Sequence, residues 1–80
     1  MANRESVNIG LSLGKLGQNI VLARKKKGIS QLRLAVLSGT SKSYICDLEH
    51  GRRNVSVALI YKIASALGVE VSTLFKGTMS

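Results

Sequence analysis

The chain has 80 residues, 45% of them apolar, with no proline, no tryptophan and a single cysteine. This length corresponds to one domain, and the apolar content gives a real core, which excludes a disordered chain. The absence of proline and the scarcity of aromatic residues argue against a β-sandwich and favour compact helices.

The net charge is +8, and most of the positive charge lies in one part of the chain. Between residues 24 and 53, eight lysines and arginines face only two acids, which leaves this segment at +6. Such a field indicates a polyanionic partner, either nucleic acid or an anionic membrane surface. The alternative is a merely soluble surface, although such surfaces usually mix both signs.

The single cysteine, Cys46, leaves no partner for an internal disulfide, and one cysteine with one histidine does not make a metal site. No stretch has the apolar run of a signal peptide or the roughly 20 residues of a transmembrane helix. We therefore expect a cytoplasmic protein in a reducing compartment, with no membrane partner, no metal and no cofactor.

Residues 1–10 show no period and are expected to form a flexible N-terminal arm, followed by one domain over residues 11–77. From Leu13 the apolar residues recur every three or four positions, which predicts a helix. The basic run over residues 24–27 suits the last turn of that helix, and Gly28 ends it.

Two short helices are predicted next. Ser30 caps the first, which ends at residues 38–39, and Ser41 caps the second, which ends at Gly51. The apolar positions of the two helices are Leu34, Ala35, Leu37, Ile45 and Leu48. Because so few residues lie between them, the two helices must turn sharply against each other, as in a helix-turn-helix.

After a polar loop over residues 52–55, a fourth helix is predicted from the Ser56 cap to Gly68. Its apolar face consists of Val57, Ile60, Ile63, Ala64 and Leu67. A short final helix from near Ser72 to Gly77 covers the core with Leu74 and Phe75. The expected fold is thus all-α, a compact five-helix bundle.

Four segments carry a resemblance to a known family: 28–35 (GISQLRLA), 39–45 (GTSKSYI), 48–51 (LEHG) and 63–68 (IASALG). In this order they resemble the phage-repressor and Cro helix-turn-helix family, also called the XRE family, over most of the chain. The resemblance implies a lambda-repressor-like bundle that binds operators as a homodimer. Double-stranded DNA is then the partner, with RNA polymerase as a further candidate.

The resemblance places base contacts at the start of the third helix. Lys42 can donate to guanine O6 and N7, and Ser43 can pair with several bases. Asp47 lies one turn after Ser43 and would accept from a cytosine N4 amine. The alternative is that Asp47 only holds Lys42 or Arg52 in position.

Phosphate contacts are implied at the second helix and around the loop after the third. In the family a glutamine at the place of Gln31 holds a phosphate beside the free amides of the helix N-terminus. Tyr44 would turn its hydroxyl toward a phosphate, or else be a half-buried core aromatic. The other predicted phosphate-binding residues are Arg33, Arg52, Arg53 and Asn54.

The family often pairs an arginine late in the first helix with a glutamate at the end of the third, here Arg24 and Glu49. Such a pair fixes the angle of the recognition helix. Two residues depart from the family pattern: Arg33 stands where most members have a glutamate that completes a capping box, and Leu32 is apolar where an acid is usual. The segments 43–45 (SYI) and 53–55 (RNV) are similar to the corresponding segments of restriction–modification controller proteins.

These features predict a sequence-specific transcription regulator that acts as a homodimer on a palindromic operator, with restriction–modification genes as candidate targets. The fourth helix and the segment after it have more apolar residues than one small core requires, which suggests a dimer interface. Its predicted residues are Leu59, Ala66, Val69, Val71 and Phe75. An alternative is an antitoxin-type protein that binds a toxin as well as operator DNA. RNA binding is disfavoured because a stacking platform of aromatics is missing, and an enzyme is not expected without a partnered nucleophile or carboxylate pair.

Overall fold

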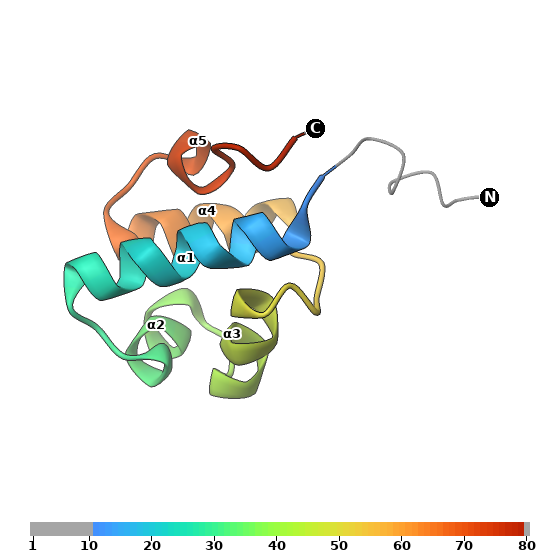
Figure 1. The fold of residues 1–80 in the computed structure, drawn as a ribbon. Helices are drawn as coiled ribbons and strands as arrows, with labels where there is room; N and C mark the ends of the chain where they lie inside the picture. The colour runs from blue at the N-terminus through green and yellow to red at the C-terminus, as the bar shows by residue number, and fades with distance from the viewer. Residues whose placement is uncertain (1–10, 80) are drawn as a thin grey trace.

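The computed structural model describes residues 11–79, so the arm predicted for residues 1–10 lies outside the described part. Five helices follow in order: α1 (Leu13–Lys27), α2 (Gln31–Ser38), α3 (Lys42–Glu49), α4 (Val57–Leu67) and α5 (Val71–Leu74). In Figure 1, α1 and α4 form the middle of the bundle, α2 and α3 lie on one side, and α5 lies on the opposite side. The predicted all-α, five-helix architecture is confirmed for these residues.

Serine caps set the starts of the first four helices. The hydroxyls of Ser12, Ser30, Ser41 and Ser56 each accept a hydrogen bond from the backbone N–H three residues further on, at 2.9–3.1 Å. Such a bond satisfies one of the amides that a helix leaves unpaired at its first turn. The short α5 differs, because it starts at Val71, one residue before the predicted start, and has no side-chain cap.

The core contains buried side chains from all five helices. Its members are Leu16, Ile20, Leu34, Ala35, Ile45, Leu48, Ile60, Ile63, Ala64, Leu67 and Leu74. Two residues predicted on apolar faces are exposed instead, Leu37 at 44% and Val57 at 73%. Leu37 lies beside the narrow buried stripe of α2, and Val57 precedes the first buried residue of α4 by a turn.

The compact region extends beyond the predicted domain end at residue 77. Thr78 is buried, and its carbonyl accepts a hydrogen bond from the Ser12 N–H at 2.7 Å. Leu11 and Met79 then form an antiparallel bridge. The segment before α1 and the segment after α5 are thereby joined (Figure 1).

None of the helices formed by residues 11–79 combines the length and the apolar character needed to cross a bilayer.

Candidate nucleic-acid interface

The leading end of α3 projects from the bundle. Lys42 and Ser43 are both exposed, whereas Ile45 and Leu48 on the opposite side of the helix are buried in the core. The packing of α3 against α1 and α2 therefore leaves one face of its first turn free. An α-helix with a free polar face has the width that the major groove admits.

Asp47 lies on α3 and contacts the loop that follows the helix. Its carboxylate accepts a hydrogen bond from an Arg52 terminal nitrogen at 3.1 Å and lies 3.8 Å from a terminal nitrogen of Arg53. Of the two partners considered for Asp47, the structure places Arg52 beside it and not Lys42. All three side chains of this cluster are more than one third exposed, so the cations remain accessible from solvent.

Tyr44 on α3 contacts two residues of the loop that follows the helix. Its hydroxyl donates to the backbone carbonyl of Asn54 at 2.8 Å, and the Arg53 guanidinium lies over its ring, 4.7 Å from the centroid. The ring itself is half-buried against the core. Tyr44 thus holds two loop residues next to the recognition helix, an arrangement that the sequence did not reveal because it depends on a contact ten residues away.

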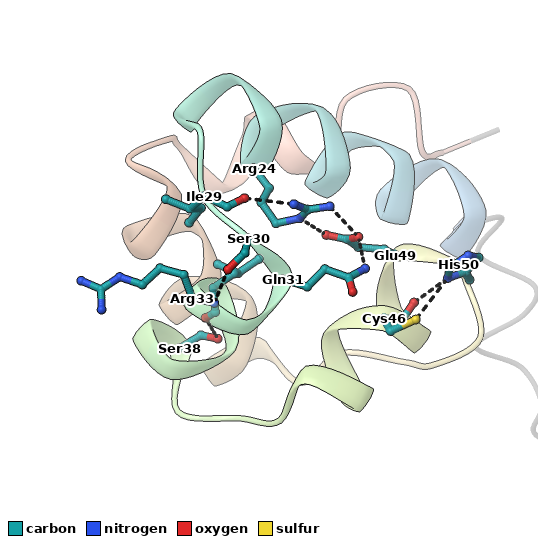
Figure 2. Close-up of polar contacts among 10 residues, drawn as sticks. Arg24, Ile29, Ser30, Gln31, Arg33, Ser38, Cys46, Glu49 and His50 are labelled. Carbon is teal, nitrogen blue, oxygen red and sulfur yellow. Dashed lines mark hydrogen bonds and ion pairs between the residues drawn. The ribbon is translucent and has the colours of Figure 1, made fainter.

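Glu49, at the end of α3, accepts hydrogen bonds from two other elements. Arg24 Nε donates to its Oε2 at 2.6 Å, and a terminal nitrogen of Arg24 donates to Oε1 at 3.2 Å. Gln31 Nε2 donates to the same Oε1 at 2.8 Å (Figure 2). The side chains of Arg24 and Glu49 are only 12% and 3% exposed, so this is a largely desolvated ion pair.

The network connects the ends of three helices. Arg24 also donates to the Ile29 carbonyl at 3.0 Å, which fixes the link between α1 and α2. The Gln31–Glu49 hydrogen bond was not predicted. It occupies one N–H of the Gln31 amide and leaves the second N–H available, since an amide nitrogen carries two. Gln31 is therefore oriented at the first position of α2, whose backbone amides are partly unpaired.

Arg33 stands apart from this network. Its side chain is exposed and projects away from Gln31 and Glu49 (Figure 2). Its backbone N–H donates to the Ser30 hydroxyl at 2.9 Å, so its place in the first turn of α2 is fixed. The structure does not bring the Arg33 guanidinium to the α3 surface.

A close approach of main chains sets how α1 lies against the end of α3. A Cβ atom built on Gly17 would overlap the Glu49 carbonyl oxygen and lie 2.6 Å from that of Leu48. Gly51, at φ +72°, also comes close to α1, because a Cβ there would lie 2.8 Å from the Gly14 Cα. Only glycine fits both places, and neither contact follows from a local pattern in the sequence.

The five residues predicted for a dimer interface are all half-buried and pack against the core of their own chain. They are Leu59, Ala66, Val69, Val71 and Phe75. The exposed large apolar side chains of α4 are Val57 and Tyr61, at 73% and 61%. These two lie four residues apart and thus share one face of the helix.

Comparison with known proteins identifies the family. The HTH_3 helix-turn-helix model matches residues 20–74. The restriction-modification controller protein C.AhdI from Aeromonas hydrophila superimposes with a TM-score of 0.77 at 48% identity, over 79% of this chain and 96% of that chain. Control protein C.BamHI from Bacillus amyloliquefaciens is 41% identical over 71 residues, 89% of this chain and 85% of the relative.

An uncharacterised HTH-type transcriptional regulator, y4dJ of Sinorhizobium fredii, is 43% identical over 54 residues, which cover 68% of this chain and 70% of the relative. Two further curated relatives, the immunity repressor of Bacillus phage phi105 and SlrR of Bacillus subtilis, are longer, and the match covers about two fifths of their length. The match covers the helix-turn-helix and the core that supports it. The chain belongs to the HTH_3 helix-turn-helix family of XRE-type transcription regulators.

Proposed function

We propose that the protein is a sequence-specific regulator that binds double-stranded DNA as a homodimer on a palindromic operator. The observation that carries the proposal is the exposed first turn of α3, with Lys42 and Ser43 free, in a helix whose other end holds the cationic loop 52–54. A recognition helix of this kind enters the major groove, and a two-fold dimer reads half-sites about 34–36 Å apart.

In this proposal, Lys42 and Ser43 contact the edges of the bases in the major groove. Asp47 has its carboxylate engaged by Arg52 and Arg53, which supports a role in positioning those cations. Its contact with a cytosine N4 amine stays a part of the proposal that rests on the family resemblance. Phosphate contacts come from the remaining polar residues around α2 and the loop. These are Gln31, Arg33, Arg52, Arg53 and Asn54. Tyr44, whose hydroxyl proton is donated to the Asn54 carbonyl, is proposed to hold the loop in place and not to bind a phosphate itself.

Restriction–modification genes are the proposed targets, because two of the relatives above are named as control or controller proteins of that kind. We place the action of the protein in the cytoplasm, where its DNA and its candidate partner RNA polymerase are found. The test of the regulatory target is whether purified protein selects, from a random duplex pool, a sequence that also occurs upstream of its own gene or of a neighbouring nuclease gene.

Lys42 and Arg53 should differ in what they contribute to DNA binding. Lys42→Ala removes a donor to base edges, so the set of selected sequences should change, with about 1–3 kcal/mol less discrimination at one position of each half-site. Arg53→Gln should weaken binding to all sequences similarly and reduce the slope of log affinity against log salt by about one per protomer. Sequence selection and salt titration measure the two effects.

The matched control is Lys25→Gln, an exposed lysine on α1 that lies outside α2, α3, the loop 52–54 and the proposed dimer interface, and it should alter neither quantity by more than a nonspecific charge effect. If Lys42→Ala and Arg53→Gln changed affinity and sequence preference in the same way, the division between base reading and phosphate binding would be wrong.

The homodimer is proposed to form through α4 and the segment after it. We expect sedimentation to show a dimer at tens of micromolar protein. Because Tyr61 is exposed on α4 next to the half-buried residues predicted for the interface, Tyr61→Glu should weaken association by about tenfold or more. Leu32→Glu on α2, equally exposed, is the control and should leave the dimer intact. A wild-type monomer at this concentration contradicts the proposal.

A further inference from the structure

A groove of about 510 Å³ lies between the second half of α1, the end of α4 and α5. Its apolar lining consists of Leu22, Ala23, Leu67 and Val69. No residue of α2 or α3 contributes to the lining, and α5 lies across the bundle from α3 (Figure 1). The groove is therefore separate from the surface proposed to meet DNA.

Three lysines surround the apolar lining: Lys26, Lys27 and Lys76. Among the residues that line the groove there is no aspartate or glutamate to balance them. Lys27 reaches over the end of α4, where its ammonium nitrogen lies 3.7 Å from the place of a Cβ on Gly68. Lysine stems can lie along an apolar wall while their ammonium groups stay in water, so the groove combines an apolar floor with a cationic rim.

The groove has an exposed apolar wall above a buried apolar base. Leu67 is buried at the base, whereas Leu22 on the wall is 64% exposed. Single exposed leucines are common on protein surfaces. Leu22 differs because it borders the groove, where it can contact an apolar side chain of a ligand.

The positive charge of the three lysines and the apolar lining together decide which kind of ligand fits the groove. Val69 belongs both to the groove lining and to the predicted dimer interface, so the groove borders that interface. A second copy seated in the groove itself would bring the same three lysines to a two-fold contact, and like charges placed opposite each other oppose association. A free small molecule needs most of its surface buried, which a groove open along one side does not provide. DNA would satisfy the lysines but not the apolar floor. An acidic peptide with one apolar anchor satisfies both.

We propose that this groove binds an acidic segment of a protein partner, with an apolar side chain seated on Leu22 and Leu67 and flanking carboxylates beside the three lysines. Since the groove lies away from α3, the partner and DNA are able to occupy the protein at the same time. The proposal does not depend on the proposed regulatory function, because peptide binding is measured without DNA.

The test uses a fluorescently labelled, blocked octapeptide with a central phenylalanine flanked by glutamates, titrated with the full chain and followed by anisotropy. Leu22→Ser, and separately the double variant Lys26→Gln with Lys76→Gln, should each weaken binding about tenfold or more. Leu32→Ser and Lys62→Gln change equally exposed residues outside the groove and should alter binding less than about twofold. A peptide with glutamines in place of the glutamates should bind about tenfold more weakly.

Three results would overturn the proposal. The first is equal binding of the octapeptide to Leu22→Ser and to Leu32→Ser, which would show general attraction to a basic protein. The second is displacement of the peptide by a saturating DNA duplex, which would place it on the α3 surface. The third is conversion of a dimer to a monomer by Leu22→Ser, which would show that a second copy covers the groove. Unchanged thermal melting of Leu22→Ser confirms that the variant is folded.

Discussion

Replacing Glu49 with alanine should lower the free energy of unfolding by about 3–5 kcal/mol, as is typical when one partner of a buried ion pair is removed. The Glu49 side chain is only 3% exposed and accepts hydrogen bonds from both Arg24 and Gln31. Its loss leaves the Arg24 guanidinium, 12% exposed, without a counter-charge. A domain of this length has about 4–12 kcal/mol of total stability, so the variant should be close to unfolding at room temperature.

Asp47→Ala provides the matched control, because it removes the other carboxylate of α3. The ion pairs of Asp47 with Arg52 and Arg53 are exposed, and such pairs contribute at most about 1 kcal/mol. Urea denaturation of the two variants measures the difference. Replacing Arg24 and Glu49 together with methionine should recover part of the loss, since neither charge is then left buried alone. Equal midpoints for Glu49→Ala and Asp47→Ala would show that the pair is not desolvated in solution.

Gly17→Ala should also destabilise the protein, by about 1–3 kcal/mol and toward the upper end of that range. The added Cβ meets the backbone carbonyls of Leu48 and Glu49, and a main chain moves less readily than the end of a flexible side chain. Relief of the overlap requires α3 to shift against α1. We therefore expect the affinity for DNA to fall even in the fraction of protein that stays folded.

Gly14→Ala is the control for this variant and should increase the free energy of unfolding instead of lowering it. It lies on the same helix, and a Cβ there has only the Ser12 hydroxyl as a neighbour, at 4.0 Å. Alanine is favoured over glycine inside a helix by up to about 1 kcal/mol, so Gly14→Ala should raise the unfolding midpoint. If chemical denaturation showed the two alanine variants to be equally stable, the close approach of α1 to α3 would be absent.

Sequence patterns located most of the elements because the interactions that start and end helices are local. Each predicted serine cap bonds to an amide three residues along the same chain, so both partners of the bond are visible in a short stretch of sequence. The family resemblance supplied the pairing of Arg24 with Glu49, which periodicity alone does not indicate. The exposed position of Lys42 and Ser43 follows directly from the burial of Ile45 and Leu48 on the same short helix.

The tertiary structure decided which partners these elements have. Contacts between Gln31 and Glu49, between Tyr44 and Asn54, and between Gly17 and the end of α3 join residues that lie 10 to 32 positions apart. Hydrophobic period gives the face of a helix but not the neighbour that covers it, which is why Leu37 and Val57 were predicted to be buried and are exposed. The chain's own residues determined where its helices begin, whereas the way the helices pack determined which side chains remain free to bind.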